Sequence, residues 1–136
     1  MLARLLLTST ALLVASSPVL AHHAFSAEFD ANRPMTLTGT VNRTEWINPH
    51  SWIHVDVEDE NGNIVTWAIE CGAPNSLMRR GLNKNSIPVG TELVIDGFGA
   101  KDGSNTANAR DITFPDGSQF FVGSSGTGAP YDGPPE

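Results

Sequence analysis

Two apolar runs on either side of an Asn-Gly pair constrain the fold of this chain most. The run over 51–58 carries aliphatic residues at every second position, which is the period of a half-buried strand. Asn61 and Gly62 then favour a tight two-residue turn, and the run over 64–69 is apolar again. The pattern therefore predicts an antiparallel hairpin in the middle of the chain.

Almost every other ordered segment is also predicted to be a strand. The expected strands outside the hairpin cover residues 35–47, 93–98, 107–114 and, in a short final piece, 119–122. One short helix is predicted over 74–82, with Asn75 or Ser76 as its cap and Gly81 as its end.

The order of these elements indicates an all-β fold. We predict a five- to six-stranded OB-like barrel with one short helix between strands 3 and 4. A small β-sandwich is the alternative. The barrel is favoured because the only predicted helix falls between the third and the fourth strand.

The first 21 residues have the features of a secretory signal peptide. Arg4 supplies a positive charge, an apolar run follows over 5–15, and small or aliphatic residues lead up to Ala21. The run is too short to span a bilayer comfortably, so no membrane span is expected after cleavage. We expect a periplasmic or secreted protein.

The chain is thus divided into four parts. We predict a signal peptide over 1–21, an amino-terminal arm over 22–34, an OB-like β domain over 35–122 and a disordered tail over 123–136. The tail is assigned on its composition, which is mainly Gly, Ser, Thr and Pro.

Charge and cysteine content narrow the function classes. The formal net charge of −7 argues against a nucleic-acid partner, because phosphates demand patches of Lys and Arg. Cys71 is the single cysteine, so no intramolecular disulfide can form. We interpret Cys71 as a small buried hydrophobe; a soft metal ligand and an intermolecular disulfide are the alternatives.

The four histidines gather in two short segments: His22 and His23, then His50 and His54. Cleavage after Ala21 would make His22 the first residue, which could bind a metal through its amine and Nδ1. His23 could instead bind through the amine, a backbone amide nitrogen and its ring. Imidazole nitrogen suits copper and zinc, and we expect copper, with zinc as the alternative.

Strand geometry limits which further histidine completes such a site. In a regular strand His50 and His54 would lie about 13 Å apart, too far to share one ion. Asn48-Pro49 favours a turn, so a bend beside His50 is plausible. We favour His50 over His54 as the ligand.

Three segments carry a resemblance to a known family: His22-His23-Ala24-Phe25, residues 38–41 and the Trp-Ile-Asn-Pro-His-containing residues 45–52. Together they resemble a family of small exported bacterial proteins of unknown function. A looser similarity is to periplasmic OB-type modules, which implies ligand or partner binding. The amino-terminal histidine alone resembles copper carriers and copper oxygenases with a histidine brace, whose other motifs are absent here.

We therefore expect a periplasmic metal-binding module for copper carriage or delivery, with a periplasmic protein as a further partner. A binding module is favoured over an enzyme, because no nucleophile elbow or other catalytic motif is present. One alternative is a metal-free OB-type module that binds a cell-envelope partner or saccharide through Trp52 and Trp67. A histidine-brace oxidase is the other alternative.

Overall fold

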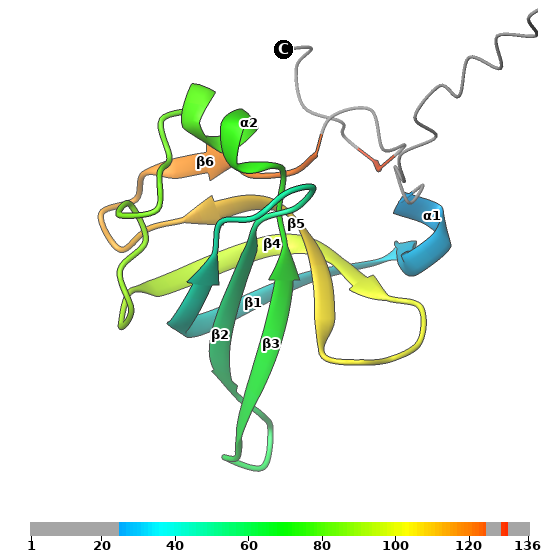
Figure 1. The fold of residues 1–136 in the computed structure, drawn as a ribbon. Helices are drawn as coiled ribbons and strands as arrows, with labels where there is room; N and C mark the ends of the chain where they lie inside the picture. The colour runs from blue at the N-terminus through cyan, green and yellow to red at the C-terminus, as the bar shows by residue number, and fades with distance from the viewer. Residues whose placement is uncertain (1–24, 125–128, 131–136) are drawn as a thin grey trace, which may run out of the picture.

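The computed structural model describes residues 25–124 and 129–130 (Figure 1). The expected signal peptide and the predicted ligands His22 and His23 lie outside this range. The described chain contains two short helices and six strands. These elements are α1 (Phe25–Glu28), β1 (Phe29–Glu45), β2 (Trp52–Glu58), β3 (Ile64–Glu70), α2 (Pro74–Arg79), β4 (Glu92–Ala100), β5 (Thr106–Thr113) and β6 (Gln119–Phe121).

All six strands belong to one sheet, in the order β3-β2-β1-β4-β5-β6. The long strand β1 pairs antiparallel with both β2 and β4, and β3 pairs parallel with β5, which closes the sheet into a ring. This connectivity is that of an OB-type fold with a sixth strand added. The all-β prediction is confirmed, and the sandwich alternative does not apply because the strands form a single sheet.

The predicted hairpin is present between β2 and β3, which pair from Trp52–Glu70 to Glu58–Ile64. Gly62 has a φ of 80°, a conformation that glycine adopts without steric cost. The carboxylate of Asp59 accepts the backbone N–H groups of Asn61 and Asn63 at 2.8 and 2.9 Å and stabilises the turn.

The core lies inside the ring of strands. Alternate residues of β2 and β3 point inward, and Val55 and Ile69 are fully buried there. A second, smaller apolar cluster lies where α1 meets β4: the Phe25 ring packs edge-on against Phe98 at 5.3 Å and near Phe29 at 5.8 Å. This second cluster fixes the start of the described chain against the sheet.

The helix between β3 and β4 is confirmed, but its cap is not the predicted one. Ala73 occupies the cap position and makes no side-chain hydrogen bond, because its methyl group has no acceptor atom; Pro74 begins the helix. Asn75 and Ser76 therefore lie inside the helix. Gly81, with a φ of 94°, follows its end as predicted.

The first strand begins at Phe29, six residues before the predicted start at residue 35. Phe29 pairs with Ala100 and packs in the second apolar cluster, which extends the strand toward the amino terminus. Residues 30–34, which belong to the predicted amino-terminal arm, lie within this strand beside an irregularity in its pairing with β4.

At the other end, two residues of the expected tail belong to the fold. Gly123 is buried, and Ser124 is half-buried. In the part of the chain that the structure describes, no helix is long and apolar enough to cross a membrane.

Candidate functional site

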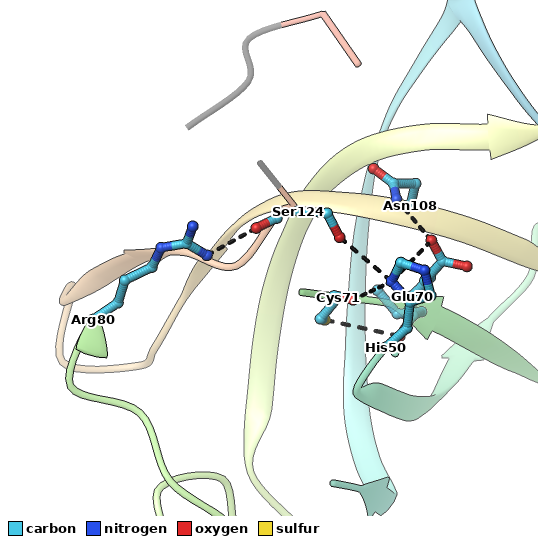
Figure 2. A network of polar contacts seen from close by, with 8 residues as sticks. His50, Glu70, Cys71, Arg80, Asn108 and Ser124 are labelled. Carbon is cyan, nitrogen blue, oxygen red and sulfur yellow. Dashed lines mark hydrogen bonds and ion pairs between the residues drawn. The ribbon is translucent and has the colours of Figure 1, made fainter. Parts of the chain in front are cut away.

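A cluster of polar side chains lies where the carboxyl end of β3 meets β5 (Figure 2). His50 comes from the segment between β1 and β2, Glu70 is the last residue of β3, and Asn108 belongs to β5. Ser124 follows β6. The four side chains thus come from four different parts of the chain.

Backbone pairing brings His50 to this place. Directly before β2, Ser51 donates its N–H to the Gly72 carbonyl at 3.0 Å, and its own carbonyl accepts the Cys71 N–H at 2.8 Å. The pairing of β2 with β3 therefore extends to the residue before β2 and to the residues after β3. The chain bends at Asn48 and Pro49, just before His50. As a result His50 stands beside the end of β3, and the predicted bend next to His50 is confirmed.

The ring of His50 contacts acceptors through its Nδ1 atom. Nδ1 lies 3.3 Å from the Cys71 carbonyl oxygen, 3.4 Å from Ser124 Oγ and 3.7 Å from Glu70 Oε1. A carbonyl oxygen can only accept, so Nδ1 carries the hydrogen. Nε2 of the neutral ring then has an unshared electron pair, and it makes no hydrogen bond within the described residues.

Glu70 is held in a mostly buried position. Only 10% of its side chain is exposed, against 15% for the His50 side chain. Asn108, which is itself buried, donates its Nδ2 hydrogen to Glu70 Oε1 at 3.2 Å. The register that places Glu70 opposite Asn108 in the parallel β3–β5 pair sets this contact.

The segment that follows β6 brings Ser124 to the cluster. Val122 donates its N–H to the Arg110 carbonyl at 2.8 Å, and Arg80 donates from Nη1 to the Gly123 carbonyl at 2.8 Å. The Arg80 guanidinium also lies over the Phe121 ring, 4.7 Å from its centre. These contacts hold Ser124 against His50.

His54 lies in a different environment. It stands in β2 opposite Arg43, and its Nε2 atom lies 2.7 Å from Glu45 Oε2 and 3.1 Å from Arg43 Nη2. One nitrogen cannot donate and accept at once, and the shorter distance favours donation to Glu45. Its Nε2 is therefore occupied, and a guanidinium stands next to it.

This pair alters the ionisation of Glu45. The hydrogen bond from His54 lowers the pKa of the Glu45 carboxyl, with smaller contributions from the charges of Arg43 and His54. The structure does not bring His50 and His54 together, since the two rings contact different residues.

Cys71 has the buried position that the sequence predicted. Its side chain is fully buried in the core, and burial raises the pKa of its thiol far above the ordinary value. The thiol points to the Ile69 carbonyl at 3.8 Å, while the Cys71 carbonyl faces His50. Burial leaves the thiol unavailable for an intermolecular disulfide.

The tryptophans do not form one binding surface. Trp52 pairs with Glu70 and Trp67 with Val55, so the two indoles lie on opposite faces of the hairpin. Trp67 packs against the core, as does Trp46. The joint use of Trp52 and Trp67 for a saccharide is therefore not supported.

Sequence reasoning missed Glu70, Asn108 and Ser124. A charged residue directly after the apolar run 64–69 was a signal that could have pointed to Glu70. Asn108 and Ser124 carry no such signal, because only the closure of the ring brings them to His50. Among residues 25–124 and 129–130, no three or more His, Cys, Asp or Glu side chains are grouped to hold a metal ion.

Comparison with known proteins gives a family but no named relative. No curated protein and no solved structure matches the chain. A family model, described as a family of unknown function, matches residues 11–109, which is more than half of the chain. The chain therefore belongs to this family of unknown function, DUF6152.

Proposed function

We propose that this protein is a periplasmic metal-binding module that carries or delivers copper, with zinc as the alternative ion. In this proposal His50 binds the ion through Nε2. His22, as the first residue after cleavage, adds its amine and its Nδ1 atom. Three nitrogen donors would then surround one ion.

The orientation of the His50 ring is the observation that carries the proposal. Histidines that bind metals commonly donate their other ring N–H to a carbonyl or carboxylate, which fixes the tautomer and makes the free nitrogen a better donor. His50 has this arrangement, with the Cys71 carbonyl at 3.3 Å and the Glu70 carboxylate at 3.7 Å from Nδ1.

The position where the described chain begins supports a role for His22. Phe25 packs on Phe98, Phe98 pairs with Asn108, and the Asn108 side chain contacts Glu70. Residues 22–24 could span about 10 Å if extended. These contacts connect Phe25, where the described residues begin, to the Glu70 side chain beside His50, and the proposal requires residues 22–24 to reach His50 from there.

His54 fits the role less well. Its Nε2 atom is occupied by Glu45, and the positive charge of Arg43 at 3.1 Å repels a cation. His54 is therefore the matched control for His50: it is a histidine of the same sheet beside a carboxylate.

Cu(II) titration of the mature protein tests the proposal. Mass spectrometry first establishes whether the chain begins at His22. We expect one Cu(II) per chain, with affinity at least about tenfold lower in His50→Ala and in His22→Ala, or about 1.4 kcal/mol of binding free energy. His54→Ala and His23→Ala should bind as the unmodified protein does.

Two results would overturn the proposal. One is unchanged Cu(II) affinity in His50→Ala. The other is affinity that stays constant from about pH 7 to about pH 4, since protons compete with metal for imidazole nitrogen. A loss confined to His23→Ala would instead assign the ion to the planar amine–amide–imidazole mode at the terminus.

A further inference from the structure

Building on the proposed metal-binding function, we infer that Glu70 is a positioning residue that makes the His50 site prefer Cu(II) to Cu(I). Its carboxylate lies behind the ring, on the Nδ1 side, while the proposed ion binds on the Nε2 side. Glu70 would act on the ion through the imidazole and without touching it.

The carboxylate is fixed by protein groups. Asn108 donates to Glu70 Oε1, the same oxygen that lies 3.7 Å from His50 Nδ1. Asn108 is in turn held by the pairing of β5 with both β3 and β4. Since 90% of the Glu70 side chain is shielded from solvent, water screens its charge only weakly.

The charge of Glu70 discriminates between oxidation states for a simple reason. The attraction between a carboxylate and a cation is proportional to the charge of the cation, so it is twice as large for Cu(II) as for Cu(I) at the same position. A hydrogen-bonded or neighbouring carboxylate also makes an imidazole a stronger electron donor. Both effects act in the same direction.

The Glu45–His54 pair is a second histidine–carboxylate contact in the same protein, and it can be compared with the Glu70–His50 pair. Glu45 approaches His54 even more closely, at 2.7 Å, but its side chain is 37% exposed and Arg43 lies 3.7 Å away. The guanidinium offsets the carboxylate charge there, and solvent screens it. Glu45 is therefore the matched control for Glu70.

The experiment measures Cu(II) and Cu(I) affinities of the mature protein and of Glu70→Gln, with Glu45→Gln as control. Glutamine keeps an acceptor oxygen for Asn108 and removes the charge, with an amide NH2 group in place of the second carboxylate oxygen. We expect Glu70→Gln to lower Cu(II) affinity about 10- to 100-fold, and Cu(I) affinity by only about 3- to 10-fold. Glu45→Gln should change neither value.

Two further variants separate the effect of the Glu70 charge from the effect of the position of its carboxylate. Glu70→Asp keeps the charge, so the ratio of Cu(II) to Cu(I) affinity should stay near that of the unmodified protein even if both affinities fall. Asn108→Ala also keeps the charge but removes the hydrogen bond that holds the Glu70 carboxylate. The ratio of Cu(II) to Cu(I) affinity should therefore fall less in Asn108→Ala than in Glu70→Gln. Circular dichroism shows whether each variant is folded.

The outcomes distinguish this inference from the function on which it rests. If His50-dependent Cu(II) binding occurs and Glu70→Gln leaves the affinity ratio unchanged, the role of Glu70 is overturned and the proposed function stands. If folded Glu70→Gln loses all copper binding, Glu70 is a ligand and the positioning role is wrong. If no copper binds through His50 at all, the proposed function fails and this inference fails with it.

Discussion

The His50 ring and the Glu70 carboxylate, which belong to different segments of the chain, lie 3.7 Å apart at the closure of the ring of strands. The β2–β3 ladder brings them together, because it continues one residue pair beyond the strands, to Ser51 and Cys71. The pairing of β2 with β1, on the other side of β2, places His54 against Glu45 of β1. One sheet therefore contains two histidine–carboxylate pairs, one mostly buried and one more exposed.

The exposed pair predicts a change in the titration of Glu45. Because the hydrogen bond from His54 lowers the pKa of the Glu45 carboxyl, His54→Ala should raise that pKa toward the ordinary value. A pH titration of the side-chain carboxyl carbon by NMR measures the shift. Asp116, whose pKa is lowered by Ser118, is the internal control and should not move.

The sign of the pH effect on stability follows from the same shift. A carboxyl with a lowered pKa binds its proton more weakly in the folded state than in the unfolded state. The pair thus stabilises the fold above the unfolded pKa of glutamate, about 4.3, and this contribution is lost as the pH falls through the lower, folded pKa. A Glu45 pKa that is the same with and without His54 would contradict the assigned contact.

Burial of Cys71 predicts an unreactive thiol. The side chain is fully buried and the pKa of its thiol is raised, so thiolate is scarce and inaccessible near pH 8. A thiol reagent such as Ellman's should label the native protein only as fast as it unfolds, and the denatured protein at once. Rapid stoichiometric labelling of the native protein would show that Cys71 is accessible.

Close packing at Gly97 predicts a destabilising substitution beside the site. A Cβ atom at Gly97 would stand 2.1 Å from the Asn108 carbonyl oxygen, so Gly97→Ala must displace β5. We expect a loss of about 1–3 kcal/mol in the free energy of unfolding, measured in urea. Gly99→Ala, on the same strand with no atom closer than 3.5 Å, is the control and should cost less. Equal losses at the two positions would count against the described β4–β5 register.

Contacts of Arg80 predict that it holds the carboxyl-terminal segment in place. Arg80→Ala removes the hydrogen bond to the Gly123 carbonyl and the contact with the Phe121 ring, and should cost about 1–3 kcal/mol of stability. The Gly72 amide, which donates to the Val122 carbonyl at 2.7 Å, should lose protection from hydrogen exchange. Arg79→Ala, at the exposed neighbouring residue, should leave that amide protected; equal exchange in both variants would refute the role of Arg80.

Local patterns were sufficient to predict much of the fold. The Asn61-Gly62 turn and the alternation in 51–58 specify the β2–β3 hairpin, and a helix before β4 is indicated by Pro74 and Gly81. The early start of β1 was not predicted, because residues 30–34 include Asp, Asn and Pro, which are typical of loops. That extension depends on Phe29 packing against distant residues of β4.

The site was predictable only in part. His50 was identified from its place beside the Asn48-Pro49 turn, and the structure puts it apart from His54. Its partners Glu70, Asn108 and Ser124 depend on which strands meet when the ring closes, and a pattern along one strand does not contain that information. The predicted role of His22 and His23 stays a prediction.

Pulsed EPR of the mature protein with one equivalent of Cu(II) tests the central claim, that His50 binds the ion, most directly. In a bound imidazole the ring nitrogen that does not bind the ion is the remote nitrogen, and it modulates the electron spin echo. We predict a remote-nitrogen signal that weakens in His50→Ala and is unchanged in His54→Ala. An identical signal in the unmodified protein and in His50→Ala would contradict the account.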